Sequence, residues 1–147
     1  MLRVYLDMCC FNRPYDDQSQ LKVAMETQCK LHIQNLIKER KLEMAASYML
    51  RYECSQNPFE MRKNTIFEFM NKHTHVYVGD RCQKEIEEKA QKIMETGIKF
   101  KDACHVASAI YAECSYFIST DKRLLKYQTN EIKMVTPIEF VTETEAD

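Results

Sequence analysis

Apolar and polar positions change spacing several times along the chain, and each change marks an expected strand or helix. Residues 2–6 form a short apolar run that ends at Asp7, which predicts a first strand buried on both faces. From about Gln18 to Glu39 the apolar residues recur at helical spacing, which predicts a long helix packed on the sheet. The segment between them, FNRPYDDQ at residues 11–18, has the composition of a turn and is expected to be a loop.

The alternation continues with a second strand at residues 42–46 and two further helices. Ser47 suits the N-cap of a helix that carries Glu53 in its second turn. The run NPFE at residues 57–60 combines a cap residue, a proline at the first helical position and a glutamate at the third. This run predicts a helix that continues to about Lys72.

A third strand and helix pair is expected next. Residues 75–78 alternate like a strand. Asp80 with Gln83 repeats the capping pattern before a helix that ends near Gly97.

The last part of the chain predicts a well-buried helix and two short strands. Apolar residues recur at three- and four-residue steps from about Lys101 to Cys114, and residues 116–118 and 134–135 form short apolar runs. Strands that alternate with helices imply a parallel sheet with right-handed crossovers. The expected fold is therefore a three-layer α/β/α sandwich around a parallel sheet of about four or five strands.

The composition fits one ordinary globular domain. The chain has 147 residues, of which 45% are hydrophobic, and its two glycines and three prolines leave no stretch that resembles a linker. We expect a single domain over residues 1–141 and an acidic, loose tail at residues 142–147.

The charge balance limits how the protein can bind nucleic acids. A formal charge of -1, from 21 basic and 22 acidic residues, excludes the strongly basic balance of non-specific nucleic-acid binders. Any nucleic-acid contact must therefore be local. Basic residues cluster in residues 38–41 and 122–126, and such short runs are more often solvated helix faces.

The cysteines and the absence of long apolar runs bear on location. Seven cysteines with no CxxC pair indicate neither a disulfide framework nor a zinc site. The first residues leave no room for a signal peptide, and no apolar run approaches membrane-spanning length. These features predict a soluble protein of the reducing cytoplasm, with no membrane contact.

Four acidic residues fall where expected strands end or helices begin, and they are Asp7, Glu53, Asp102 and Asp121. In an open α/β sheet the carboxyl ends of the strands share one edge, so the four side chains can converge there. Carboxylates suit Mg²⁺ or Mn²⁺, which would relieve their mutual repulsion and could activate a water against a phosphodiester.

Helix capping is the competing explanation of these acids. Taken singly, Asp102 and Asp121 are better explained by helix capping. Asp7 and Glu53 are harder to explain in that way, because both lie among apolar residues where an unpaired carboxylate is costly.

Five further residues are candidates for the same site. His105 lies three residues after Asp102 on the same helix face, where it can contact substrate, hold a carboxylate or, more commonly, simply pack in the core. Asn12 and Arg13 can approach substrate phosphates, or equally well build a turn and cap the long helix. Ser119 and Thr120 lead into the last acid and are expected to contact substrate.

Two stretches of the second half resemble the PIN-domain family of metal-dependent nucleases. GIKFKDACHVASA at residues 97–109 resembles the family's aspartate-led helix, and YFISTD at residues 116–121 resembles its strand that ends in a hydroxyl residue and an aspartate. VYLD at residues 4–7 resembles the first strand and first metal ligand, and Ser47 with Glu53 resembles the helix-borne glutamate. The resemblance covers nearly the whole chain.

The resemblance implies an α/β/α sandwich that cleaves RNA endonucleolytically with Mg²⁺ or Mn²⁺. All four acids would be catalytic metal ligands, with His105 in support. Many members are toxins of prokaryotic toxin–antitoxin pairs, so the resemblance implies an antitoxin partner. It also leaves open whether the protein forms a homodimer. The chain departs from the family in having Cys9 where a small hydroxyl residue is often found, and in its longer segment at residues 11–18.

Two other functions compete with the ribonuclease. One is a catalytically silent RNA- or protein-binding module of the same fold that keeps the acids as caps, against which the complete acid set argues. The other is a phosphotransfer or phosphatase domain with an aspartate nucleophile after the first strand. It ranks last, because Cys9 rather than a second aspartate follows Asp7 and no glycine-rich phosphate loop is present.

Overall fold

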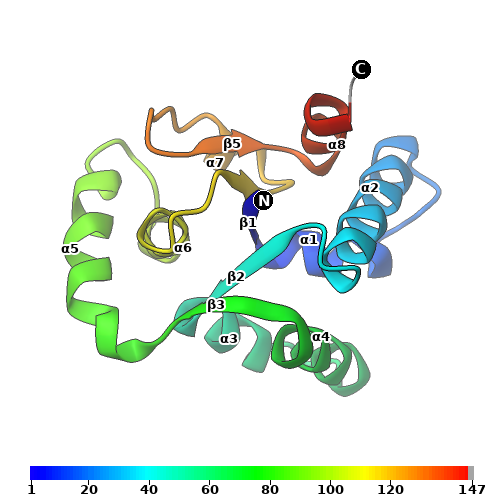
Figure 1. The fold of residues 1–147 in the computed structure, drawn as a ribbon, viewed down its shortest axis with the longest axis horizontal. Helices are drawn as coiled ribbons and strands as arrows, with labels where there is room; N and C mark the ends of the chain where they lie inside the picture. The colour runs from blue at the N-terminus through cyan, green and yellow to red at the C-terminus, as the bar shows by residue number, and fades with distance from the viewer. Residues whose placement is uncertain (146–147) are drawn as a thin grey trace.

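The computed structural model describes residues 1–145 and contains a central sheet of five strands, all parallel, in the order β3-β2-β1-β4-β5 (Figure 1). The strands are β1 (Arg3–Leu6), β2 (Glu43–Ser47), β3 (Thr74–Val78), β4 (Tyr116–Ile118) and β5 (Lys133–Val135). The predicted α/β/α sandwich is confirmed.

Helices cover both sides of this sheet. They are α1 (Met8–Asn12), α2 (Leu21–Lys38), α3 (Tyr48–Ser55), α4 (Glu60–His73), α5 (Gln83–Met94), α6 (Phe100–Tyr111), α7 (Lys122–Leu125) and α8 (Pro137–Glu145), with 3₁₀ turns η1 (Arg13–Tyr15) and η2 (Asp80–Cys82). Figure 1 shows α5 and α6 on one side of the strands and α2 and α8 on the other, while α3 and α4 lie near β2 and β3.

The core is built around the central strand β1. Val4, Tyr5 and Leu6 are fully buried, as expected for a strand covered on both faces. The Tyr5 ring stacks on Phe117 of β4 with the centroids 5.4 Å apart. Residues 103–109 of α6 are all buried, because the helix packs on both the sheet and α5. The apolar spacing of these segments therefore reflects real burial, which stabilises the fold by roughly 1.5–3 kcal/mol for each large side chain.

The strand order reverses beside the central strand β1. The chain moves from β1 to β2 on one side and later returns to β4 on the other, so the order reverses between β1 and β4. Leu6 and Ile118 pair at the ends of these strands, and the Asp7 N–H donates to the Ile118 carbonyl at 2.9 Å. Open α/β sheets bind ligands at such a point, outside the carboxyl ends of the strands.

Two loop and helix-start predictions need correction. Residues 11–18 are not a plain loop, because Phe11 is only 1% exposed and belongs to α1, after which η1 follows. At residues 57–60 the helix begins only at Glu60. The Asn57 side chain instead accepts from the Phe59 N–H at 2.9 Å, so it closes the turn before the helix.

The structure also differs from the sequence expectation at residues 80–83 and at the chain end. Asp80 starts a 3₁₀ turn without a side-chain cap, and the Gln83 side chain bonds to Glu87 at 3.0 Å. Residues 142–145 are part of α8, where buried Phe140 fixes the helix on the domain. Of the expected tail, only residues 146–147 lie outside the described part of the chain.

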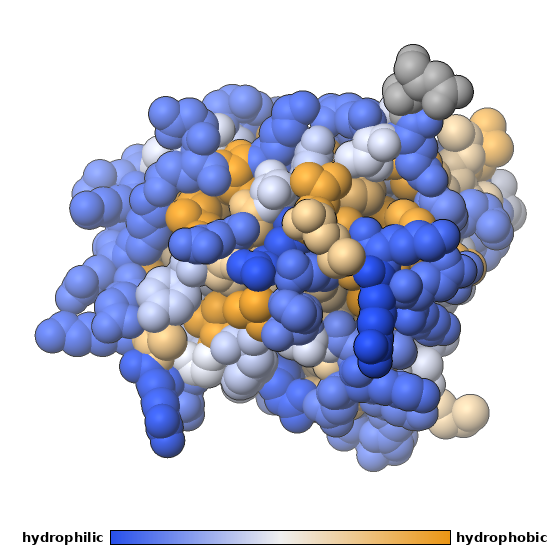
Figure 2. Space-filling view, viewed as in Figure 1, coloured by the Kyte–Doolittle hydropathy of each residue, from blue (hydrophilic) through white to orange (hydrophobic). Residues whose placement is uncertain are grey.

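The surface is mostly polar on the face seen in Figure 2, with hydrophobic residues gathered near its middle. Within residues 1–145, no helix combines the length and apolar character that crossing a membrane requires.

Candidate carboxylate site

Asp7 stands at the end of β1, where it is 6% exposed and caps α1. Its Oδ1 accepts from the Met8 N–H at 2.9 Å and its Oδ2 from the Ser119 hydroxyl at 2.9 Å. Burial raises the pKa of Asp7 and the Glu53 charge adds to this, although the His105 charge and the Ser119 hydrogen bond oppose it. A buried carboxylate with a raised pKa is one that a nearby cation would stabilise.

Cys9 and Ser119 form a small network around Asp7. The Cys9 thiol lies 3.5 Å from Asp7 Oδ2 and 3.3 Å from Ser119 Oγ, and it accepts from the Thr120 N–H at 3.3 Å. Ser119 Oγ also accepts from the Asp121 N–H at 3.0 Å. Ser119 is fully buried, so its side chain joins β4 to Asp7 rather than facing a substrate, and Cys9 fills the place expected for a hydroxyl residue. Thr120 contributes its backbone to this network.

Glu53 is held by a chain of hydrogen bonds that crosses the core. His105 Nε2 of α6 lies 2.5 Å from Glu53 Oε1, and His105 Nδ1 lies 2.7 Å from the Tyr5 hydroxyl. The Tyr5 hydroxyl lies 2.6 Å from Ser47 Oγ, which in turn accepts from the Leu50 N–H and caps α3. Ser47 is thus the N-cap that the sequence predicted, and His105 contacts a carboxylate.

Two directions of these hydrogen bonds are compatible with the cap, because the Ser47 hydroxyl oxygen has two acceptor sites. With His105 neutral, Ser47 donates to Tyr5, Tyr5 donates to His105 Nδ1, and His105 Nε2–H donates to Glu53. With His105 protonated, both ring nitrogens donate, so the Tyr5 hydroxyl accepts from Nδ1 and donates to Ser47 Oγ.

The Glu53–His105 contact perturbs both groups in the direction of an ion pair. Burial lowers the pKa of His105, but the Glu53 hydrogen bond and the Asp7 charge outweigh burial and raise it. Burial raises the pKa of Glu53, but the hydrogen bond and charge of His105 outweigh burial and lower it. Once protonated, His105 pairs directly with the Glu53 carboxylate.

The two remaining acids have different surroundings. Asp121 caps α7, with its Oδ1 accepting from the N–H groups of Arg123 at 2.9 Å and Leu124 at 3.4 Å. Asp102 lies in the first turn of α6, but the N-cap is Lys99 and the helix has no side-chain cap. Within residues 1–145 the Asp102 carboxylate has neither a hydrogen bond nor an ion pair. Capping therefore explains Asp121 and fails for Asp102.

The four acids influence one another electrostatically. Burial raises the pKa of Asp102, and the charges of Asp7, Asp121 and Glu53 raise it further. Yet in the described part of the chain no three His, Cys, Asp or Glu side chains are arranged to hold a metal ion. Glu53 turns to His105 and Asp121 Oδ1 is used as a cap, so the acids are grouped without being focused on one point.

The donor set suits a hard divalent cation. It consists of carboxylate oxygens, and the Asp102 carboxylate is free of hydrogen bonds within residues 1–145. To bind the cation, Glu53 would have to give up its hydrogen bond to His105. This requires only a movement of the Glu53 side chain, because the Ser47 cap fixes the position of α3.

Arg13 is engaged within the protein. Its Nε and Nη2 both donate to Glu26 Oε1, at 3.0 and 2.7 Å, and its Nη1 donates to Asp16 at 3.1 Å. Glu26 is fully buried, so this contact ties η1 to α2. The structure matches the turn-building alternative for Arg13 rather than the phosphate contact.

Asn12 lines a cavity with one of the four acids, Glu53, and with an arginine that the sequence pattern did not predict. Asn12, Glu53, Asn57, Phe59 and Arg62 are among the residues that line a cavity of about 360 Å³. The Arg62 guanidinium lies 4.0 Å from the centre of the Phe59 ring. An aromatic residue three positions before an arginine at a helix start was the only sequence signal for this pair.

No protein-family model matches the sequence, and no curated protein does so either. Solved structures do share its fold. FitAcB from Neisseria gonorrhoeae matches with a TM-score of 0.55 and 16% identity over 92% of this chain and 98% of that one. VapBC2 from Rickettsia felis, bound to a DNA fragment from their promoter, matches with a TM-score of 0.54 and 12% identity over 90% of this chain and 97% of that one. At this identity the likeness shows the fold.

Proposed function

We propose that this protein is a metal-dependent endoribonuclease in which Asp7, Glu53, Asp102 and Asp121 hold Mg²⁺ or Mn²⁺. The observation that carries the proposal is the state of Asp102. It is partly buried beside three other acids at the strand-order reversal, has a raised pKa, and has no partner within residues 1–145. The first turn of α6 favours an acid electrostatically, but that alone does not explain why three further carboxylates lie close enough to raise its pKa, whereas a cation site does.

The residues around the site would prepare it for this chemistry. When bound, the cation would lower the pKa of a water and stabilise charge on the scissile phosphate. Asp7 is held in place by Met8 and Ser119, and His105 keeps Glu53 ionised by lowering its pKa. The chain thus orients both carboxylates and keeps Glu53 ionised, while a bound cation would favour the ionised form of Asp7.

The wider biological role is proposed from the same resemblance. Because many members of the PIN-domain family are toxins, the proposed nuclease would act as a cytoplasmic toxin with an antitoxin partner. A neighbouring gene for a small DNA-binding protein that co-purifies with this chain would support that role, and a gene with no such neighbour would oppose it. Exposed Tyr52 and Met61 on α3 and α4 support a homodimer, which size-exclusion chromatography can test.

The test measures metal binding and RNA cleavage on the same samples. Wild type, Asp7→Asn and Asp102→Asn are titrated with Mn²⁺ or Mg²⁺ by calorimetry and assayed on a structured RNA, with exposed Asp80→Asn as the control. We expect each site variant to lose cleavage by about 10²-fold or more and to bind metal more weakly, while Asp80→Asn behaves as wild type. A folded Asp102→Asn protein with wild-type cleavage would refute the proposal.

The binding module of the same fold is the second candidate. It is favoured by the absence, within residues 1–145, of three side chains already arranged around one metal position. A folded wild-type protein that binds RNA but neither binds the metal nor cleaves would establish this function instead.

A further inference from the structure

Lys30 is a buried cation without a counter-charge. It lies in the middle of α2 and is only 5% exposed. Its side chain makes no hydrogen bond or ion pair within residues 1–145, and its ammonium lies 5.4 Å from the centre of the Phe11 ring. Burial lowers the pKa of Lys30 to about 8. A buried lysine is normally paired, so this one is free to bind an anion from outside.

The groove that Lys30 faces runs between α2 and α4 and carries further unpaired cations. Its volume is about 420 Å³, and its lining includes Lys30, Lys38 and Lys72, with Glu68 as the one acid among the described lining residues. Lys38 and Lys72 form no ion pair in the described part of the chain. Lys38 follows Lys30 by eight residues on α2, which corresponds to about 12 Å along the helix. The groove therefore presents spaced positive charges next to the aromatic ring of Phe11.

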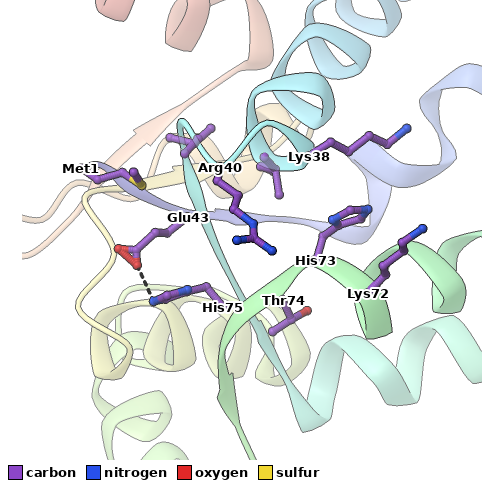
Figure 3. Close-up of a pocket in the computed structure, with 10 residues that line it drawn as sticks. Met1, Lys38, Arg40, Glu43, Lys72, His73, Thr74 and His75 are labelled. Carbon is purple, nitrogen blue, oxygen red and sulfur yellow. Dashed lines mark ion pairs between the residues drawn. The ribbon is translucent and has the colours of Figure 1, made fainter.

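A second cavity continues this groove at the far ends of α2 and α4. It has a volume of about 650 Å³, shares Lys38, Lys72 and His73 with the groove, and adds Arg40. Figure 3 shows Arg40 extending into the space between the end of α2 and the start of β3, with Lys38 and Lys72 pointing to one common side. The acid of this cavity, Glu43, is already bonded to His75 at 2.8 Å.

Helix ends explain only part of this charge. Cations are favoured in the last turn of a helix, which accounts for Lys38 and Lys72. Lys30 lies mid-helix, beyond the reach of that effect. Arg40 has φ 60, in the left-handed region where helix ends usually place glycine. The bonds from the Arg40 N–H to the Ile37 carbonyl and from the Lys41 N–H to the Leu36 carbonyl account for that backbone as a helix end, so the buried, unpaired Lys30 is the feature that points to a ligand.

Aromatic residues link the groove to the acids. Tyr15 lines the groove, and the Arg62 guanidinium lies 4.8 Å from the centre of its ring. Arg62 and Phe59 in turn line the cavity that contains Glu53. Exposed Tyr15 and Phe59 around an arginine suit the bases of a single strand, because aromatic faces stack on any base.

We propose that the substrate RNA leaves the carboxylate site past Arg62 and Tyr15 and runs as a single strand along the α2–α4 groove, with its phosphates bound by Lys30, Lys38 and Arg40. This inference rests on the proposed ribonuclease function and names the path of its substrate. It also gives a chain of net charge -1 a local way to bind RNA, because four cations without ion pairs in the described residues, Lys30, Lys38, Arg40 and Lys72, line this groove and its continuation.

The test measures RNA binding without cleavage. A labelled, unstructured single-stranded RNA is titrated in EDTA by fluorescence anisotropy against wild type, Lys30→Gln, Lys38→Gln and Arg40→Gln, with Lys84→Gln on exposed α5 as the control. We expect each groove variant to weaken binding about three- to tenfold and to reduce the slope of log K against log salt by about 0.7. The control should match wild type. Arg40 and Lys38 are exposed, so their variants report on binding even if Lys30→Gln does not fold.

The outcomes separate this path from the catalytic proposal. Metal-dependent cleavage by wild type with RNA binding unchanged in all three groove variants would overturn the path and leave the nuclease standing. RNA binding that is lost in the groove variants but kept in Asp7→Asn supports the path whether or not the protein cleaves. An acidic peptide that binds the groove while RNA does not would also overturn it.

Discussion

Replacing Tyr5 with phenylalanine tests the hydrogen-bond chain behind Glu53. The substitution removes one hydroxyl from a fully buried ring and leaves the stack on Phe117, 5.4 Å between centroids, in place. Ser47 Oγ and His105 Nδ1 then each lose a hydrogen-bond partner. Both residues are fully buried, so water cannot replace the missing hydroxyl without entering the core.

The expected cost follows from those two unsatisfied groups. Each buried polar group left without a partner costs about 1–3 kcal/mol, and partial relaxation brings the expected total for Tyr5→Phe to about 2 kcal/mol. For a domain of this size that loss lowers Tm by about 4–8 °C. Because His105 holds Glu53, cleavage by the proposed nuclease should fall as well.

Urea unfolding followed by circular dichroism measures this loss. Tyr77→Phe is the matched control, because Tyr77 is 50% exposed and its hydroxyl makes no hydrogen bond within residues 1–145. It should change the free energy of unfolding by less than about 0.5 kcal/mol. A double-mutant cycle of Tyr5→Phe with Ser47→Ala should give a coupling energy of about 0.5–3 kcal/mol. Equal stabilities of Tyr5→Phe and Tyr77→Phe, or zero coupling, would refute the hydrogen-bond chain.

Three further predictions concern charge. The pKa of His105 is raised in the folded protein, so its contribution to the free energy of unfolding is full below the unfolded pKa of about 6.5 and is lost as pH rises through the folded pKa. Urea unfolding at a series of pH values should show this loss in wild type. His105→Gln should flatten the pH dependence. Arg13→Ala leaves the buried Glu26 carboxylate without its ion-pair partner and should lower the free energy of unfolding by about 3–5 kcal/mol in the same assay. Exposed Arg81→Ala, the control, should change it very little, and equal losses in the two variants would contradict the buried pair. Asp102→Asn should raise Tm at pH 7 in EDTA, because burial first and the neighbouring acidic charges second raise the pKa of this carboxyl and destabilise its ionised form; a lower Tm would contradict this reasoning.

The parts of the fold that sequence predicted are those where local pattern and tertiary burial agree. The run from Val4 to Leu6 reads as a strand covered on both faces and is fully buried in the centre of the sheet. Ser47 reads as an N-cap and accepts the Leu50 N–H. In both cases the same residues satisfy the local preference and the global packing, so neighbouring elements had nothing to override.

The parts that sequence missed depend on contacts between distant residues. Residues 11–15 have turn composition, yet burial of Phe11 and the contact between Arg13 and Glu26 on α2 wind them into α1 and η1. The His105–Glu53 bond joins residues 52 positions apart, on two helices. Spacing placed both near the sheet edge, but only the three-dimensional arrangement shows that Glu53 faces an imidazole.

Capping and metal binding do not exclude each other at this site. An ionised carboxylate has about four lone-pair sites, so Asp7 and Asp121 can accept the N–H bonds of α1 and α7 and still ligate a cation. Their hydrogen bonds are thus compatible with both the nuclease and the silent binding module. Asp102 differs, because it caps nothing and has no partner within residues 1–145. A binding module has no use for a repelled, partnerless acid, so the two functions give different expectations for Asp102→Asn.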